Sequence, residues 1–178
     1  MADSELEETT RRAAEAGDAA AMTRLGGLLM MKGERDEAER WWRRAAELGD
    51  AAGTSNLAAL LFERDPGEAE ALLRRAAATR EPTALHNLGF IVSKRDPEEA
   101  AKWYLMAAQR GYAWSMYNYA TYILDSNADE AVRWLTRAAN TGDAASMRKL
   151  ASLLQKRDPQ RAAAWAQRAE AAEQRGQP

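Results

Sequence analysis

The stretch "EEAAKWYLMAAQRGYAWSMYNYA", residues 98–120, decides the fold because its pattern recurs along the chain. Steps of 31 residues from Trp103 lead to the equivalent positions in four other copies: Trp41, Leu72, Trp134 and Trp165. Self-similarity at a fixed period of roughly 20–50 residues is typical of repeat proteins. The sequence therefore predicts five copies of one structural unit.

Each unit is predicted to hold two helices. The composition is rich in alanine, leucine, arginine and glutamate, which favour helix. A Gly–Asp pair such as Gly49–Asp50 marks the start of the first helix, because glycine ends the previous helix and aspartate accepts hydrogen bonds from free amides. An Asp–Pro pair such as Asp65–Pro66 marks the start of the second helix, where proline's missing N–H costs nothing. The linking turns are short, so the two helices run antiparallel.

These features predict an all-α fold, an α/α superhelix in which helix hairpins with a 31-residue repeat stack into a right-handed solenoid. We expect a single domain over residues 1–178. A capping helix is predicted at residues 4–16, where Thr9 and Thr10 replace the tryptophan pair and give a polar outer face. Five hairpins are predicted after it, at residues 19–48, 51–79, 82–110, 113–141 and 144–173.

The central units resemble a known family. The positions that carry the resemblance are Asn87-Leu88-Gly89, Ala100, Trp103-Tyr104, Ala107-Ala108 and Gly111. This pattern is similar to the Sel-one-like repeat, a branch of the tetratricopeptide superfamily, over nearly the whole chain. The resemblance implies that the first helices line a concave surface where peptides and partner proteins dock. The loop within each hairpin is shorter than the family's, since the period is 31 rather than about 34 residues.

Charge and composition exclude several classes of function. The chain has 25 Lys and Arg against 27 Asp and Glu, so no basic excess draws it to nucleic acid or an anionic membrane. It has no cysteine, which excludes disulfides and thiolate metal sites. No run of about 18 apolar residues is present, so we expect no membrane-spanning helix. The N-terminus has no basic start followed by an apolar run, and we expect a cytoplasmic protein, with a secreted mature form as the alternative.

One face of the first helices is predicted to be core, because its positions are apolar in every unit. The three core positions hold Leu25, Leu57, Leu88, Tyr119 and Leu150; Leu28, Leu60, Ile91, Tyr122 and Leu153; and Leu29, Leu61, Val92, Ile123 and Leu154. A fourth position is always small, which permits close helix approach: Gly26, Ala58, Gly89, Ala120 and Ala151. On the second helices, the repeated tryptophans are expected to pack between hairpins, since they follow the period of the fold.

The opposite face of the first helices varies from unit to unit, as a binding surface would. Trp114 and Tyr117 stand where other units have small residues such as Ala52 and Ser55. Tyr112 replaces the usual acidic residue, so this first helix lacks its carboxylate cap. Aromatic and arginine residues are the usual energetic anchors of interfaces. The predicted partner-binding residues are His86, Asn87, Phe90, Trp114, Tyr117, Asn118, Thr121 and Arg148.

A polar ladder runs beside this variable face and consists of Arg24, Asn56, Asn87, Asn118 and Lys149. Asparagine offers one acceptor and two donors, which suits holding a peptide backbone. The same side chains can instead tie neighbouring helices together. Both interpretations remain open at this point.

No catalytic residue, metal site or cofactor is predicted. His86 is the only histidine, and it has no carboxylate four residues away. Ser146 and Lys149 fit the Ser-x-x-Lys pattern of penicillin-recognising enzymes, but the companion motifs are absent. No phosphate loop or dinucleotide fingerprint appears. The dibasic pairs Arg43–Arg44 and Arg74–Arg75 stand beside glutamates and are expected to form (i, i+4) ion pairs on a solvated face.

The sequence supports three interpretations of function. The first is a non-catalytic scaffold or adaptor that binds an unknown protein or peptide on the first-helix surface. The second, suggested by the resemblance, is a small-molecule binder or an enzyme with penicillin-binding or hydrolase-like activity. The third is a self-associating structural protein, and we expect a monomer or a weak homo-oligomer.

Overall fold

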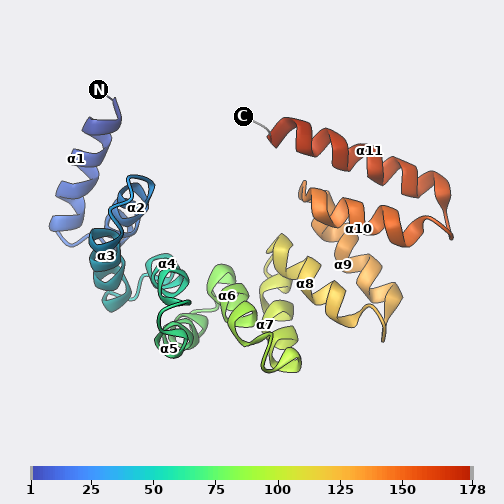
Figure 1. Ribbon diagram of the computed structural model, residues 1–178, viewed down its shortest axis with the longest axis horizontal. Helices are drawn as coiled ribbons and strands as arrows, with labels where there is room; N and C mark the ends of the chain where they lie inside the picture. The colour runs from blue at the N-terminus through green and yellow to red at the C-terminus, as the bar shows by residue number, and fades with distance from the viewer. Residues whose placement is uncertain (1, 177–178) are drawn as a thin grey trace. The chain divides into compact units, whose positions relative to one another are not determined.

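The computed structural model describes residues 2–176, and within that range it forms eleven α-helices and no strand (Figure 1). The all-α prediction is therefore confirmed. The helices are α1 Ala2–Glu15, α2 Ala19–Met31, α3 Arg35–Glu47, α4 Ala51–Leu61, α5 Pro66–Ala77, α6 Pro82–Val92, α7 Pro97–Gln109, α8 Ala113–Ile123, α9 Ala128–Asn140, α10 Ala144–Leu154 and α11 Pro159–Gly176.

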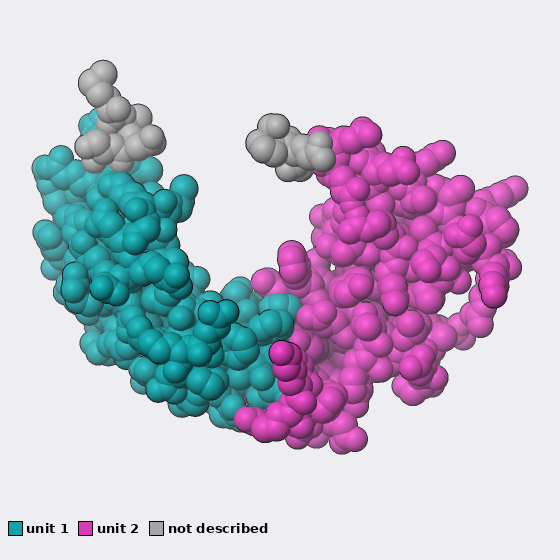
Figure 2. Space-filling view, viewed as in Figure 1, with its two compact units in different colours: residues 1–92 teal, residues 93–178 magenta. Residues whose placement is uncertain are grey.

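The chain divides into two compact units, residues 1–92 and residues 93–178 (Figure 2). Unit 1 holds α1 to α6, and unit 2 holds α7 to α11. The third predicted hairpin, residues 82–110, has its first helix in unit 1 and its second in unit 2. A single domain over the whole chain stays a prediction.

Within each unit, helices pack against their neighbours in sequence. In unit 1 each helix from α1 to α6 contacts the next, and α2–α4 and α4–α6 also pack together. The first helices of successive hairpins therefore stack side by side. In unit 2 the same succession runs from α7 to α11. This is the packing that repeated hairpins need, because one hairpin alone cannot bury its apolar face.

The helices begin where the capping residues predict. Asp50 accepts a hydrogen bond from the Gly53 amide at 2.6 Å, and Gly49 before it has a φ of +83°. At the second helices, Asp65 accepts from the Glu68 amide at 2.9 Å. The same capping bond recurs at Asp18, Asp96, Asn127, Asp143 and Asp158.

Three helix starts depart from this scheme, and the first is α3, which Glu34 precedes without a side-chain capping bond. Tyr112 precedes α8 without a side-chain capping bond, as predicted, yet α8 still begins at the next residue. Before α6, Arg80 takes the left-handed position that glycine holds in other units, with a φ of +59°. Glu81 supplies the cap there by accepting from the Ala84 amide at 2.7 Å.

The buried positions recur with the repeat period, and one residue predicted to be in the core is not. Leu29, Leu61, Val92, Ile123 and Leu154 are all buried, as are four of the five small residues at the close-approach position. Tyr122 was expected in the core, but its side chain is 45% exposed. Leucine or isoleucine at its position is only half-buried in the other units. This position is the margin of the core, where the longer tyrosine extends into solvent.

The periodic tryptophans on the second helices divide into two kinds. Trp41 and Trp165 are buried, which confirms the packing prediction, whereas Trp103 and Trp134 are half-buried. Trp134 meets the edge of Tyr119 with ring centroids 5.9 Å apart. The expected ion pairs of the dibasic segments form within the same helices, from Arg43 to Glu39 and from Arg74 to Glu70.

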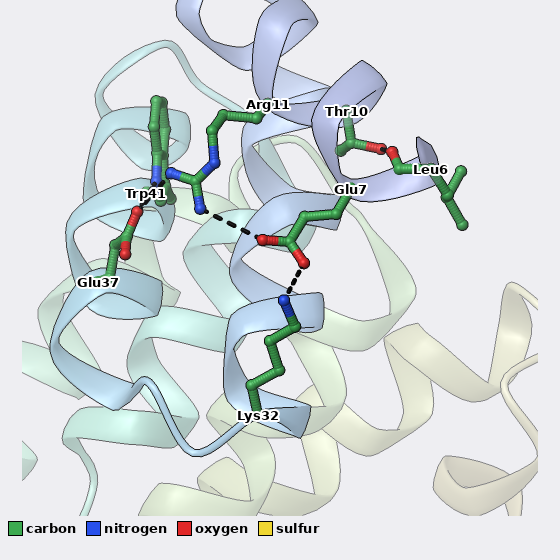
Figure 3. A network of polar contacts seen from close by, with 7 residues as sticks. All are labelled: Leu6, Glu7, Thr10, Arg11, Lys32, Glu37 and Trp41. Atoms are coloured by element: carbon green, nitrogen blue, oxygen red, sulfur yellow. Dashed lines mark hydrogen bonds and ion pairs between the residues drawn. The ribbon is translucent and has the colours of Figure 1, made fainter. Parts of the chain in front are cut away.

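The capping helix α1 is held to α2 and α3 by a polar network (Figure 3). Arg11 donates to Glu37 at 2.6 Å, and Glu7 pairs with both Arg11 and Lys32. The Arg11 guanidinium lowers the pKa of the Glu37 carboxyl. Thr10 was predicted on a polar outer face together with Thr9. Thr9 is exposed, but Thr10 is buried and satisfies its hydroxyl by donating to the Leu6 carbonyl at 2.7 Å.

Candidate functional site

The predicted partner-binding residues lie on two units. His86, Asn87 and Phe90 lie on α6 in unit 1. In unit 2, Trp114, Tyr117, Asn118 and Thr121 lie on α8, and Arg148 lies on α10. We describe each group within its own unit.

A pocket of about 220 Å³ opens between α8 and α10 in unit 2. Its lining consists of Trp114, Tyr117, Asn118, Asp143 and Ala145. Three of these residues were predicted to bind a partner. The Trp114 ring stands largely in solvent, with 67% of its surface exposed, while Tyr117 and Asn118 are half-buried. A large exposed aromatic side chain beside a pocket is a recognisable interaction feature.

Asp143 is the charged pocket residue that the sequence did not predict. It caps α10, where one of its carboxylate oxygens, Oδ2, accepts from the Ser146 amide at 2.8 Å. That cap stands beside the first turn of α8, so the same side chain also forms a wall of the pocket. One signal in the sequence could have indicated this residue. Asp143 stands one repeat after Tyr112, and the capping residue of each first helix lies near the start of the first helix of the preceding hairpin.

Burial raises the pKa of Tyr104 on α7, and the polar side chains of Ser93 and Asn118 beside its phenol act against that rise. Asn118 therefore faces α7 at this rung of the ladder, and both interpretations of the ladder stay predictions. Of the other rungs, Arg24 and Asn56 are exposed, and Asn87 and Lys149 are half-buried.

Two further predicted residues already have partners in unit 2. The Thr121 hydroxyl donates to the Tyr117 carbonyl at 2.9 Å, within α8. Arg148 forms an ion pair with Glu173 on the terminal helix α11. A partner that used Arg148 would have to compete with that carboxylate.

The predicted residues of unit 1 form an aromatic surface on α6. Phe90 is 56% exposed and lies against Phe62, the residue directly after α4, with ring centroids 5.7 Å apart. His86 is half-buried, and its burial lowers its pKa to about 4. The imidazole is therefore neutral at physiological pH.

The buried state of His86 predicts a loss of stability on acidification. Its pKa is about 4 in the fold against 6.5 unperturbed, so lowering the pH through that window protonates the unfolded chain first. The free energy of unfolding should fall by about 2 kcal/mol between pH 7.5 and pH 5. Urea titrations at the two pH values, compared with His86→Gln, measure this term, because carboxylate effects cancel in the difference. An NMR titration of this only histidine with a midpoint near 6.5 would contradict the prediction.

The Ser-x-x-Lys pattern does not present an accessible nucleophile. Ser146 is fully buried in the first turn of α10, and its hydroxyl has no hydrogen-bond partner. Equivalent residues are small in the other units because the position packs tightly. At Gly53 an added Cβ would lie 2.7 Å from the Ala45 side chain. Ser146 therefore occupies a packing position.

The described part of the chain, residues 2–176, holds neither a metal-binding cluster nor a membrane-spanning helix. No cluster of three or more histidine, cysteine, aspartate or glutamate side chains there could hold a metal ion. No helix in the same range has the length and apolar character to cross a membrane.

Comparison with known proteins gives a family and a fold. The protein-family model described as the Sel1 repeat matches residues 19–50, 61–78, 84–112, 108–143 and 144–173. No curated protein matches the chain. Among solved structures, the chain is similar to a Sel1 repeat protein from Oxalobacter formigenes, with a TM-score of 0.86, 24% identity, and coverage of 96% of this chain and 80% of that one.

Two other solved structures have the same fold. One is c5321, a protective antigen of uropathogenic Escherichia coli with an SLR fold, at a TM-score of 0.80 and 23% identity. The alignment covers 96% of this chain but 44% of that one, so this chain spans less than half of that relative. The other is the Cut9–Hcn1 hetero-tetramer of the APC/C, at a TM-score of 0.70 and 19% identity, covering 97% of this chain and 37% of that one.

Proposed function

This chain belongs to the Sel1 repeat family, and from that premise we propose that it is a non-catalytic scaffold that binds a peptide or a segment of a partner protein on α8 and α10. Repeats of this type commonly serve as protein-interaction scaffolds. One structural neighbour, Cut9–Hcn1, is itself a hetero-tetrameric assembly. The observation that carries the proposal is the pocket beside the exposed Trp114 ring.

The residues around this pocket suit protein binding. Tryptophan, tyrosine and arginine dominate the energetic centres of interfaces, and Trp114 and Tyr117 stand together here. Trp114 does not serve the core, since most of its surface is exposed. Removing it should therefore affect binding without a matching loss of stability.

The size of the pocket favours a peptide side chain over a free small molecule. Small-molecule sites usually enclose about 300–1,000 Å³, whereas this pocket measures about 220 Å³. A single partner side chain needs less room, and its neighbours in the peptide can lie outside the pocket. The buried Ser146 hydroxyl also gives no support to an acylation reaction.

Selection of displayed random peptides against the whole protein tests this function. The peptides that wild type enriches should bind at least about tenfold more weakly to the Trp114→Ala/Tyr117→Ala variant, because the variant loses two aromatic anchors. Helical circular dichroism and thermal melting should remain near wild type. Isothermal titration calorimetry with the enriched peptides gives the affinities.

A matched control replaces exposed residues away from α8 and α10, Lys102 and Gln109 of α7, with alanine. This variant should keep wild-type affinity. Equal binding by wild type and the aromatic double variant would refute the proposed surface. If the double variant unfolds, the aromatic pair belongs to the core and the proposal is wrong. Light scattering during the titration separates peptide binding from self-association.

A further inference from the structure

The chemistry of the Trp114 pocket indicates what kind of side chain it takes. The pocket combines two aromatic rings, Trp114 and Tyr117, with the carboxylate of Asp143. An aromatic face attracts a cation through its quadrupole, and a carboxylate attracts the same cation by charge. None of the five described residues that line the pocket is a lysine or an arginine. The pocket therefore offers two independent attractions to a positive group and no cation of its own.

The same chain already uses this pairing on its second helices. Arg44 lies over the Trp41 ring with its guanidinium carbon 4.6 Å from the ring centre. Arg137 over Trp134 and Arg168 over Trp165 repeat the contact at 4.4 and 4.1 Å. Each of these arginines stands three residues after its tryptophan. At Trp114 that position holds Tyr117, so the helix supplies a second ring and leaves the cation to a partner.

The charges around the pocket also favour a cation. The N-terminus of α10 carries roughly half a positive charge, which the full negative charge of Asp143 exceeds. Arg148, one turn further along α10, is paired with Glu173. An acidic side chain in the pocket would face Asp143 at close range, and an apolar one would desolvate that carboxylate without adding a hydrogen bond to it.

We propose that this pocket is the anchor site for a basic side chain, arginine in preference to lysine, of a peptide bound along α8 and α10. Arginine is preferred because its planar guanidinium can stack on the rings while its N–H groups reach the carboxylate. The inference rests on the proposed function and specifies its partner chemistry. The partner is therefore a protein segment with an exposed arginine.

The test uses capped heptapeptides of sequence Gly-Ala-Ala-X-Ala-Ala-Gly, with X as arginine, lysine, citrulline, leucine, phenylalanine or glutamate. The tryptophan indole N–H signals report binding, and Trp114→Phe identifies the signal of Trp114. The arginine peptide should shift the Trp114 signal with an affinity about tenfold above that of citrulline, which has the same shape without the charge. Lysine should follow arginine, and glutamate should bind least.

Asp143→Asn is the decisive variant. Asparagine caps helices as well as aspartate does, so α10 should stay intact while the pocket loses its charge. The arginine peptide should then bind about five- to tenfold more weakly, and the citrulline peptide should be unaffected. Asp18→Asn makes the same change at the cap of α2 in unit 1 and should alter neither affinity.

The outcomes separate this inference from the proposed function. If leucine or phenylalanine binds best, or if Asp143→Asn leaves the arginine affinity unchanged, the basic anchor is wrong while the scaffold stands. Peptides selected from the random library that depend on Trp114 and Tyr117 but lack a basic residue would lead to the same conclusion. If neither the heptapeptides nor the library yields a binder that depends on Trp114, both proposals fail.

Discussion

Replacement of Trp42 by alanine is expected to lower the free energy of unfolding by about 4 kcal/mol. Trp42 lies on α3 and is only 6% exposed. Its indole N–H donates to the Thr23 carbonyl on α2 at 3.0 Å. The ring also fills the space against Gly26, which has no side chain that could move into a cavity. The variant therefore loses buried apolar surface, a hydrogen bond and the packing between two helices.

The chain supplies a matched control for Trp42→Ala. Trp114→Ala makes the same chemical change at a ring that is 67% exposed, and it should cost about 0.5 kcal/mol or less. Urea unfolding followed by far-UV circular dichroism measures both variants. Similar losses in the two variants would contradict the division of tryptophans into packing and surface residues.

The repeat period predicted most of the fold because packing repeats with the sequence. Positions such as that of Leu29 and Leu61 are buried in every described unit, since each hairpin meets its neighbour in the same way. Caps were equally predictable, because a cap depends on residues three apart in the chain. Prediction was wrong where a position lies at the margin of the core. Tyr122 is exposed and Thr10 is buried, since residue type alone does not give the depth of such a position.

The candidate site was less predictable from the sequence. Variation between units pointed to Trp114 and Tyr117, because a position free of packing demands can change from copy to copy. The same variation did not point to Asp143. An aspartate at this position is already explained by helix capping, so nothing in the sequence suggested a second role. Its place in the pocket depends on how α8 and α10 lie beside each other. The period alone does not give that arrangement, because it comes from helix packing.

The second large effect is expected from Gly26→Ala, with a loss of about 2 kcal/mol in the free energy of unfolding. A Cβ at Gly26 would lie 2.4 Å from Trp42 Nε1 and 2.6 Å from its Cδ1. The indole or the helix must therefore move, which strains the α2–α3 contact. Alanine is a better helix former than glycine by about 1 kcal/mol, and the predicted loss already includes this gain. Urea unfolding is again the measurement.

Gly27→Ala is the control for that change. Gly27 is the next residue of the same helix, and an added Cβ there would meet nothing within 4 Å. The variant gains helix propensity without a clash and should be more stable by about 0.5–1 kcal/mol. A loss of unfolding free energy in Gly26→Ala together with a gain in Gly27→Ala would show that the neighbouring Trp42 ring, rather than backbone conformation, requires glycine at residue 26. A stabilising Gly26→Ala would contradict the close packing.

The double variant Gly26→Ala/Trp42→Ala decides whether the two effects share one contact. If the cost of Gly26→Ala comes from the indole, removing Trp42 removes that cost and leaves only the helix-propensity gain. The double variant should then be more stable than Trp42→Ala alone, and the coupling between the two sites should reach about 2–3 kcal/mol. Additive losses would place the strain elsewhere in α2. The small residue and the tryptophan pair of this repeat would then be separate requirements of the fold.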